Sequence, residues 1–249
     1  MNSTILACSN CSWQYGVQSP SPSGTLYGGF VRVKMPSSLP SLNCLYVIWA
    51  SVSSANYFYQ TSLGYSPSYG WHISAGSTNP GVACDLACPP FQVGGSTFRP
   101  QPGKTYEIGI RFVPQTGGSY QVHLYFVDVS SGTLYDIYVV TDSGTMTTPV
   151  GGILESYDID NSDLNKLGNG NCLEVVNANW LTAPYVSAQW PHGYVYGPTT
   201  QTCKQNPDGS YSGYQAVPGG ITINKIASGD FKIGYQVGGS QYQSGYQLW

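Results

Sequence analysis

The stretch Thr105-Tyr-Glu-Ile-Gly-Ile-Arg-Phe112 has the clearest alternation of residue types in the chain. In an extended strand successive side chains point to opposite faces, so one face of this stretch would be apolar. That face carries Tyr106, Ile108, Ile110 and Phe112. The other face carries small, polar or charged residues, and this pattern is typical of an antiparallel sheet that covers a core on one side.

The pattern continues on both sides of this stretch. Turn-forming residues at Gln115–Gly118 and Ser130–Thr133 predict hairpins, so residues 105–141 should form a three-stranded meander. No segment longer than about ten residues shows a helical period. Further strands are predicted at Gly28–Lys34, Cys44–Ser53, Tyr57–Tyr65, Gly70–Ala75, Val150–Asp158, Cys172–Asn179, Gly220–Ile226 and Asp230–Val237. The predicted fold class is all-β, an antiparallel two-sheet β-sandwich.

The organisation of the chain points to one domain over residues 1–249, because no repeat or linker divides it. Residues 181–218 are rich in Pro, Gly and Tyr and are expected to form long loops. The low-complexity tail, residues 238–249, should be either a frayed end or an aromatic strand that docks late.

Charge is scarce in this sequence: 8% of the residues are Asp, Glu, Lys or Arg, against roughly 25% in an average soluble domain. A chain with few ionisable groups loses little when its carboxylates are protonated, so one hypothesis is that it works in acid. A low-charge extracellular protein at neutral pH is the alternative. The arginines are isolated, which argues against nucleic-acid binding. No apolar run reaches the roughly 18 residues needed to span a membrane.

The seven cysteines suggest an oxidising compartment. Cys8-Ser-Asn-Cys11 is half of a zinc ribbon without a second pair, so we expect disulfides and no metal. Cys84 and Cys88 would suit a local disulfide loop, although pairing cannot be read from sequence and the odd count leaves one thiol. The N-terminus lacks an intact secretion signal, and we interpret it as a mature form with an added Met.

Acidic residues are few enough that each one is informative, and there are three glutamates. Glu107 and Glu174 suit ion-paired or solvated strand positions. Glu155 follows two glycines, which permit close approach of another backbone or a ligand, although an exposed strand acid would look the same. Asp158-Ile-Asp-Asn-Ser-Asp163 has the spacing of a calcium loop but lacks its Gly and distal Glu, so an Asx-rich turn is the better interpretation.

The order of several segments resembles the glutamic peptidases of the eqolisin type, secreted acid proteases with a concanavalin-like double sheet. The matching segments are Ser12–Val17, with Trp13; Gly28–Pro36; Leu45–Val52, with Trp49; Phe58–Gly64, with Gln60; Thr105–Val140; Gly151–Glu155; Gly219–Ile223; and Asp230–Tyr235. The loop Cys84–Phe91 is similar to one in the related neprosin-type peptidases, which use two glutamates. Because Gln60 stands at the first catalytic position, the Gln/Glu version fits better.

The resemblance implies a jelly-roll sandwich, a polypeptide substrate and catalysis by Gln60 and Glu155 without a cofactor. Glu155 would take a proton from water and later give it to the leaving amine. Gln60 would stabilise the oxyanion. Trp13, Trp49 and Trp71 would bind substrate, with ordinary core packing as the alternative. The expected protein is a secreted monomer.

Two other functions suit the same sequence. The tyrosines and tryptophans could stack on sugars in a carbohydrate-binding or glycan-cleaving sandwich. A retaining glycosidase needs two carboxylates about 5–5.5 Å apart, so Glu155 would need an acidic partner. Alternatively, the Tyr/Gln/Gly-rich tail could mediate assembly of a structural, capsid-like protein.

Overall fold

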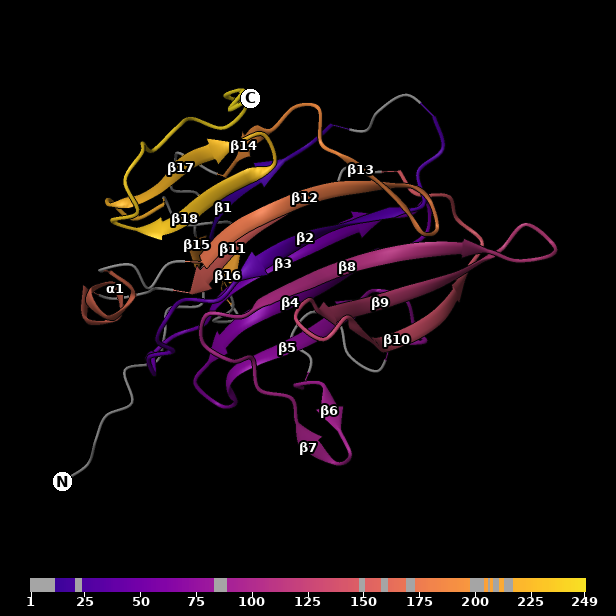
Figure 1. Cartoon of the computed structure of the whole chain (residues 1–249), viewed down its shortest axis with the longest axis horizontal. Helices are drawn as coiled ribbons and strands as arrows, with labels where there is room; N and C mark the ends of the chain where they lie inside the picture. The colour runs from indigo at the N-terminus through magenta and orange to yellow at the C-terminus, as the bar shows by residue number, and fades with distance from the viewer. Residues whose placement is uncertain are drawn as a thin grey trace.

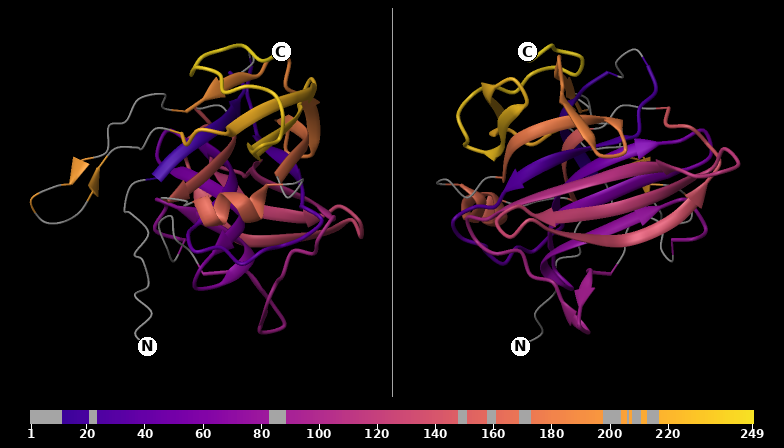
Figure 2. Two further views of the ribbon diagram at one scale, coloured as in Figure 1. Left: turned by 90° about the vertical axis from the view of Figure 1, so that its left-hand side faces the viewer. Right: turned by 45° about the vertical axis from the view of Figure 1, so that its right-hand side comes forward.

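The structure is a computed structural model that describes residues 12–20, 24–82, 89–147, 151–157, 161–168, 173–197, 204, 205, 207, 211, 212 and 217–249. Two large antiparallel sheets lie face to face (Figures 1 and 2). Their inward-pointing side chains form a shared hydrophobic cluster, so the predicted two-sheet β-sandwich is confirmed.

The first sheet has six strands in the order β14-β1-β11-β3-β4-β5. Their bounds are β1 Ser12–Gln18, β3 Tyr46–Ser53, β4 Phe58–Ser66, β5 Gly70–Ser77, β11 Gly151–Tyr157 and β14 Tyr194–Tyr196. The first strand, β1, lies between β11 and β14 although both come much later in the sequence.

The second sheet has eight strands, seven of them in the order β10-β9-β8-β2-β12-β18-β17, while β13 pairs with β12. Their bounds are β2 Gly28–Lys34, β8 Thr105–Pro114, β9 Tyr120–Asp128, β10 Thr133–Asp142, β12 Leu173–Ala183, β13 Val186–Gln189, β17 Ile221–Ala227 and β18 Asp230–Tyr235. The predicted meander of residues 105–141 is β8, β9 and β10.

Three smaller elements were not predicted: the β6–β7 hairpin, the β15–β16 hairpin and the helix α1. Their bounds are β6 Gln92–Val93, β7 Ser96–Thr97, β15 Lys204–Gln205, β16 Tyr211–Ser212 and α1 Asn161–Leu167. Residues 158–160 of the segment interpreted as an Asx-rich turn lie outside the described residues, and residues 161–163 form the start of the helix and not a turn. Its Asp163 is fully buried and accepts hydrogen bonds from the backbone N–H groups of Asn43 and Cys44, so this carboxylate joins α1 to the segment before β3.

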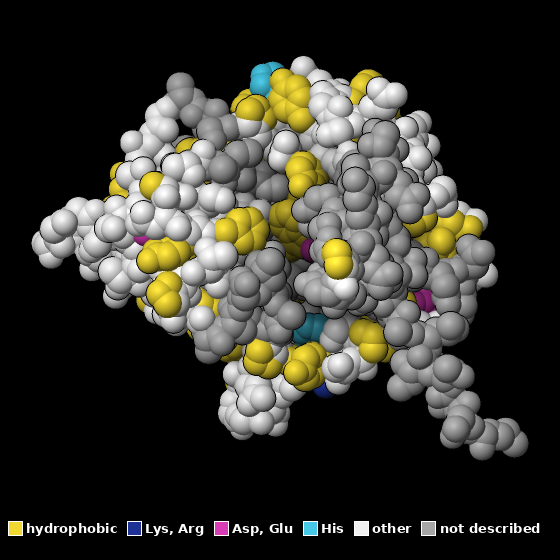
Figure 3. Space-filling model, turned by 180° about the vertical axis from the view of Figure 1, so that it is seen from behind, with side chains coloured by type: hydrophobic (Ala, Val, Ile, Leu, Met, Phe, Trp, Pro, Cys, Tyr) yellow, Lys and Arg dark blue, Asp and Glu magenta, His cyan; other side chains and the backbone are white. Residues whose placement is uncertain are grey.

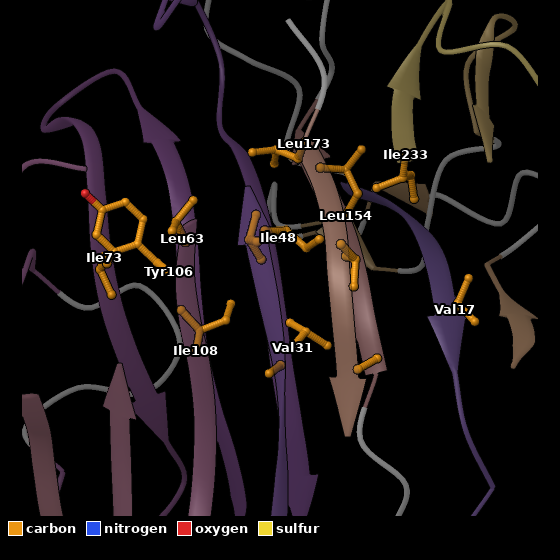
Figure 4. Close-up of a cluster of buried hydrophobic side chains, with 14 of the residues drawn as sticks. Val17, Val31, Ile48, Leu63, Ile73, Tyr106, Ile108, Leu154, Leu173 and Ile233 are labelled. Atoms are coloured by element: carbon orange, nitrogen blue, oxygen red, sulfur yellow. The ribbon is translucent and has the colours of Figure 1, made fainter. Parts of the chain in front are cut away.

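The core lies between the sheets and is filled by alternate residues of both (Figure 4). Ile48, Leu63 and Leu154 project from the first sheet, while Val31 and Ile108 project from the second, and all five are 0% exposed. Burial of each such side chain is worth about 1.5–3 kcal/mol. This packing fixes which face of the first sheet points outward.

The polar face of β8 differs from the expectation, because it is buried. Glu107 and Arg111 are 8% and 9% exposed. Glu107 accepts hydrogen bonds from Arg32 at 2.9 Å and from the Tyr125 hydroxyl at 3.0 Å. The Arg111 guanidinium lies over the rings of Tyr125 and Tyr185. Charge pairing and aromatic contacts compensate the loss of water on this face.

The region predicted as long loops contains β13 and β14, and the tail beyond it is docked. Val195 of β14 exchanges backbone hydrogen bonds with Tyr246 and Gly245. Leu248 is 7% exposed. The tail is therefore the docked aromatic segment that the sequence left open as one of two alternatives.

The expectations about a membrane span and about disulfides can be checked only in the described residues. In those residues, no helix is long and apolar enough to cross a membrane. Cys44 is in a disulfide. The other six cysteines, and with them the Cys84–Cys88 pairing, lie outside the described residues.

Candidate functional site

The outer face of the first sheet carries the candidate site. Strand alternation and register put Gln14, Glu155, Val47, Gly64 and His72 in one row across β1, β11, β3, β4 and β5. The next row contains Gly16, Ile153, Trp49, Ser62 and Ser74. Side chains of directly paired residues point to the same face, so these residues share a single surface.

Glu155 lies near the middle of this surface and is held by neutral donors. Gln14 Nε2 donates to Glu155 Oε1 at 3.2 Å, and Trp49 Nε1 donates to Oε2 at 3.1 Å. The Ser12 hydroxyl also hydrogen-bonds to the carboxylate. Both carboxylate oxygens are therefore positioned by neighbouring strands, β1 on one side and β3 on the other.

Burial raises the pKa of Glu155 above its ordinary value. Hydrogen bonds from Gln14, Ser12 and Trp49 act in the opposite direction, because they stabilise the charged form, but burial outweighs them. None of the groups that shift this pKa is charged. A carboxyl group with a raised pKa is suited to take up and release a proton.

Gln14 is itself held by Tyr196 of β14, whose hydroxyl donates to Gln14 Oε1 at 3.2 Å. Tyr196 also packs against a small outer cluster formed by Val47, Trp49 and Ile153. Gly16 pairs with Tyr196 in the register, and because it has no side chain it leaves the space beside Tyr196 open. A Cβ at Gly16 would lie 2.7 Å from the Cα of Ile153.

Trp49 is the predicted substrate-binding residue that lies at this site. Its indole is 7% exposed, packs in the outer cluster and donates to Glu155. It therefore combines an apolar contact surface with a direct bond to the candidate catalytic carboxylate.

Trp13 and Trp71 point the other way, into the core between the sheets. Trp13 is 0% exposed. Trp71 is 7% exposed, makes an edge contact with Tyr65, and donates from Nε1 to the carbonyl of Pro40 at 2.8 Å. Period-2 alternation puts each of them next to a residue of the site, Gln14 and His72, but on the opposite face. Core packing, the alternative that the sequence left open, describes both tryptophans.

The predicted dyad partner Gln60 lies on the same outer face as Glu155 but in a different part of it. Gln60 pairs with Ser51, whereas Glu155 pairs with Val47, so the two are separated by two strands and four residues. Strand geometry converts this into about 10 Å across the sheet and about 13 Å along it. The register therefore does not bring these two side chains together.

Between Gln60 and Glu155 the register puts Ser51, Ser62 and the indole of Trp49, and further small residues lie on β5. Ser51, Ser62 and Ser74 are each 7–8% exposed, and the hydroxyls of Ser62 and Ser74 lie 2.9 Å apart. His72 is 5% exposed, and burial lowers its pKa. Figure 3 shows an acidic side chain in a recess near the centre of the molecule's rear face, with hydrophobic side chains beside it. Small residues leave room for a ligand backbone to approach such a surface.

The other two glutamates lie on the second sheet. Glu107 is in β8, and Glu174 is in β12 within 3.8 Å of Lys34 and 4.0 Å of Lys232. Neither can share a substrate with Glu155. Among the described residues, His, Cys, Asp and Glu form no group of three or more that could hold a metal.

Sequence reasoning missed Gln14 and Tyr196. The alternation Trp13-Gln14-Tyr15-Gly16-Val17 could have shown that Gln14 points away from the core, on the face opposite Trp13. Tyr196 lies in a region without a strand pattern, so nothing local in the sequence marked it.

Fold and site together define a β-sandwich with one partly buried carboxylate on the outer face of one sheet. Solved structures of glutamic peptidases share this fold. One is a crystal structure of Scytalido-glutamic peptidase with a peptide-based transition-state analogue, with a TM-score of 0.50 and 9% identity over 90% of this chain and 98% of that one. Another is SCP-B, a member of the eqolisin family in complex with the tripeptide Ala-Ile-His, with a TM-score of 0.47 and 10% identity over 90% and 98% of the two chains.

At this level of identity the likeness is one of fold, and the resemblance drawn from the sequence is confirmed to that extent. No protein-family model matches the chain, and no curated protein matches it in sequence.

Proposed function

We propose that this protein is a peptidase in which Glu155 is the acid–base group. The observation that carries the proposal is the Glu155 carboxylate, which has a raised pKa and neutral hydrogen-bond donors on the outer face of the sheet. The shared fold with a peptidase solved with a peptide-based transition-state analogue supports a polypeptide substrate.

In the proposed reaction the Glu155 carboxylate removes a proton from water, and the oxygen of that water bonds to the scissile carbonyl carbon. The carbonyl π electrons move onto its oxygen, and an amide N–H donor stabilises the resulting oxyanion. The protonated Glu155 then gives its proton to the leaving nitrogen, the C–N bond breaks, and the carboxylate is restored. General acid–base catalysis of this kind contributes roughly 10²–10⁴-fold.

Gln60 is the residue whose amide the sequence resemblance predicted as the oxyanion donor. It lies on the same outer face, beyond Trp49 and Ser62, where an extended peptide bound over Glu155 would reach it. As an oxyanion donor it would act on kcat, and as a substrate contact it would act on KM.

We further propose secretion and action in acid, as the sequence suggested, at pH values near the raised pKa of Glu155 where part of the carboxyl group is still ionised. The scarcity of charge supports action in acid, since 8% charged residues leave little electrostatic stability to lose. The seven cysteines support secretion, because they suit an oxidising compartment. A glycosidase with a pair of glutamates is less well supported, because Glu107 and Glu174 belong to the other sheet.

Cleavage of an unfolded protein between pH 2 and pH 7 tests the proposal. Glu155→Gln should lose at least about 10²-fold in kcat, because a carboxamide cannot act as a general base. Glu174→Gln is the matched control: it makes the same chemical change on the second sheet and should keep wild-type activity.

A Glu155→Gln variant with half or more of the wild-type activity would contradict this role. Absence of cleavage by the wild type at every pH would overturn the peptidase proposal. A glycan array and light scattering would then test the carbohydrate-binding and structural functions.

A further inference from the structure

Gln14 is the glutamine in hydrogen-bonding contact with Glu155. It is directly opposite Glu155 in the β1–β11 register, and its Nε2 lies 3.2 Å from Glu155 Oε1. That distance is at the long end of the range for N–H···O bonds. Such contacts in a free enzyme often tighten only when substrate is bound. A water or a substrate oxygen entering here would contact both groups.

The orientation of the Gln14 amide is set from its far side. Tyr196 donates its hydroxyl proton to Gln14 Oε1 at 3.2 Å. A carboxylate only accepts hydrogen bonds, so the amide nitrogen must face Glu155 and the amide oxygen must face Tyr196. The hydrogen bonds from Tyr196 to Gln14 and from Gln14 to Glu155 thus fix one orientation of the Gln14 amide, with its N–H group directed at the carboxylate.

Gln60 does not have this geometry. It is two strands and four residues from Glu155 on the outer face, about 16 Å between backbone positions by strand geometry. An oxyanion donor has to lie about 3 Å from the oxygen of the carbonyl that the base-activated water attacks. Gln14 is close enough to Glu155 to contact a carbonyl held beside that carboxylate, whereas Gln60 is too far from it.

We propose that Gln14, oriented by Tyr196, is the amide partner of Glu155 in catalysis. In the resting site its N–H group donates to the carboxylate, and during hydrolysis it donates to the oxyanion of the attacked carbonyl. Tyr196 is a positioning residue that acts through Gln14. This inference rests on the proposed peptidase function. It replaces Gln60 of β4 with Gln14 of β1 as the partner of Glu155 in β11.

Kinetics of variants test the assignment. Gln14→Met keeps the volume but removes the donor, and it should lower kcat by about 10²–10³-fold with little change in KM. Tyr196→Phe removes one neutral hydrogen bond and should lower kcat by roughly 2- to 10-fold. The matched control is Gln18→Ala, on the same strand and face but paired with Gly151, which should stay within twofold of wild type. Gln60→Ala should change KM more than kcat.

A carboxyl titration by NMR gives a second readout that needs no turnover. With three glutamates in the chain, ¹³C-labelled Glu gives three side-chain signals, and Glu155→Gln identifies one of them. In Gln14→Met the pKa of Glu155 should rise, because a donor to the charged form is lost while the site stays filled.

The outcomes separate the two proposals. If the wild type cleaves nothing, the peptidase function fails, and the titration still decides whether Gln14 pairs with Glu155. If the wild type is active, a Gln14→Met variant with full kcat overturns the inference, as does an unshifted pKa of Glu155. A loss of 10²-fold or more in Gln60→Ala with an active Gln14→Met would return the role to Gln60.

Discussion

At the scale of single residues, burial of Glu155 destabilises its charged form and also gives the carboxyl group the raised pKa that suits proton transfer. Burial disfavours its charged form, and its hydrogen-bond donors Gln14, Ser12 and Trp49 are neutral, so they compensate this cost only in part. A group whose folded pKa is raised contributes stability below its unfolded pKa, about 4.3 for Glu, and that stability is lost as the pH rises through the folded pKa. The wild type therefore keeps a destabilising carboxylate at neutral pH.

We expect Glu155→Gln to be more stable relative to wild type at pH 7 than at pH 3. The variant removes a buried charge at pH 7, whereas at pH 3 it replaces a protonated carboxyl with an amide of similar size. Urea unfolding of both proteins at the two pH values measures the difference. An equal difference at both pH values would show that Glu155 is not destabilised by burial.

At the scale of elements, the site depends on the contact between β1 and β14. Backbone hydrogen bonds from the C-terminal tail hold the free edge of β14, and this strand carries Tyr196 to Gln14. The residue after it, Gly197, has φ of +147°. A Cβ there would lie 2.5 Å from the backbone oxygen of Gln14. Glycine is therefore required where the chain leaves β14.

Gly197→Ala should separate β14 from β1 and weaken the Tyr196–Gln14 hydrogen bond. The backbone strain should cost about 1–3 kcal/mol, and kcat should fall at least as far as in Tyr196→Phe. Denaturant unfolding and peptide cleavage measure the two effects. Gly117→Ala, also at positive φ but in a hairpin turn with open space around it, controls for strain alone and should keep activity.

At the scale of the whole molecule, the described groups that couple stability to pH act in opposite senses. Against the effect of burial, hydrogen bonds lower the pKa of Asp128, and burial lowers that of His72, while burial raises the pKa of Asp230. Burial raises the pKa of Asp142, but hydrogen bonds from Ser54, Gly144, Asn56 and Tyr59 together lower it below its ordinary value. Its stabilisation is lost as the pH falls through the folded pKa. Glu155 acts in the opposite sense, because its raised pKa favours the folded state as the pH falls.

We therefore expect the free energy of unfolding to change by no more than about 2 kcal/mol between pH 7 and pH 3. For a domain of this size that corresponds to less than about 8 °C in Tm. Thermal unfolding followed by circular dichroism across this range measures it. A Tm that collapses between pH 5 and pH 2 would contradict both this expectation and the proposed action in acid.

Much of the architecture could be predicted from local pattern. Period-2 alternation in Thr105–Phe112 reports one buried face directly, and Gly-rich turns separate the strands that follow. The same alternation misjudged the polar face of β8, because the pairing of Glu107 with Arg32 and Tyr125 depends on neighbouring strands. The strands β13 and β14 have weak patterns of their own, since they are stabilised by pairing with β12 and β1.

The sequence by itself determined the sandwich, the strand that carries Glu155 and the scarcity of charge, because these depend on residue type and short-range periodicity. The tertiary structure decided which side chains surround Glu155. It put Trp49 beside the carboxylate, turned Trp13 and Trp71 into the core and separated Gln60 from it by strand register. It brought Gln14 and Tyr196, 182 residues apart in the chain, into one hydrogen-bonded chain. Register between distant strands is set by packing of the whole core, and no local segment encodes it.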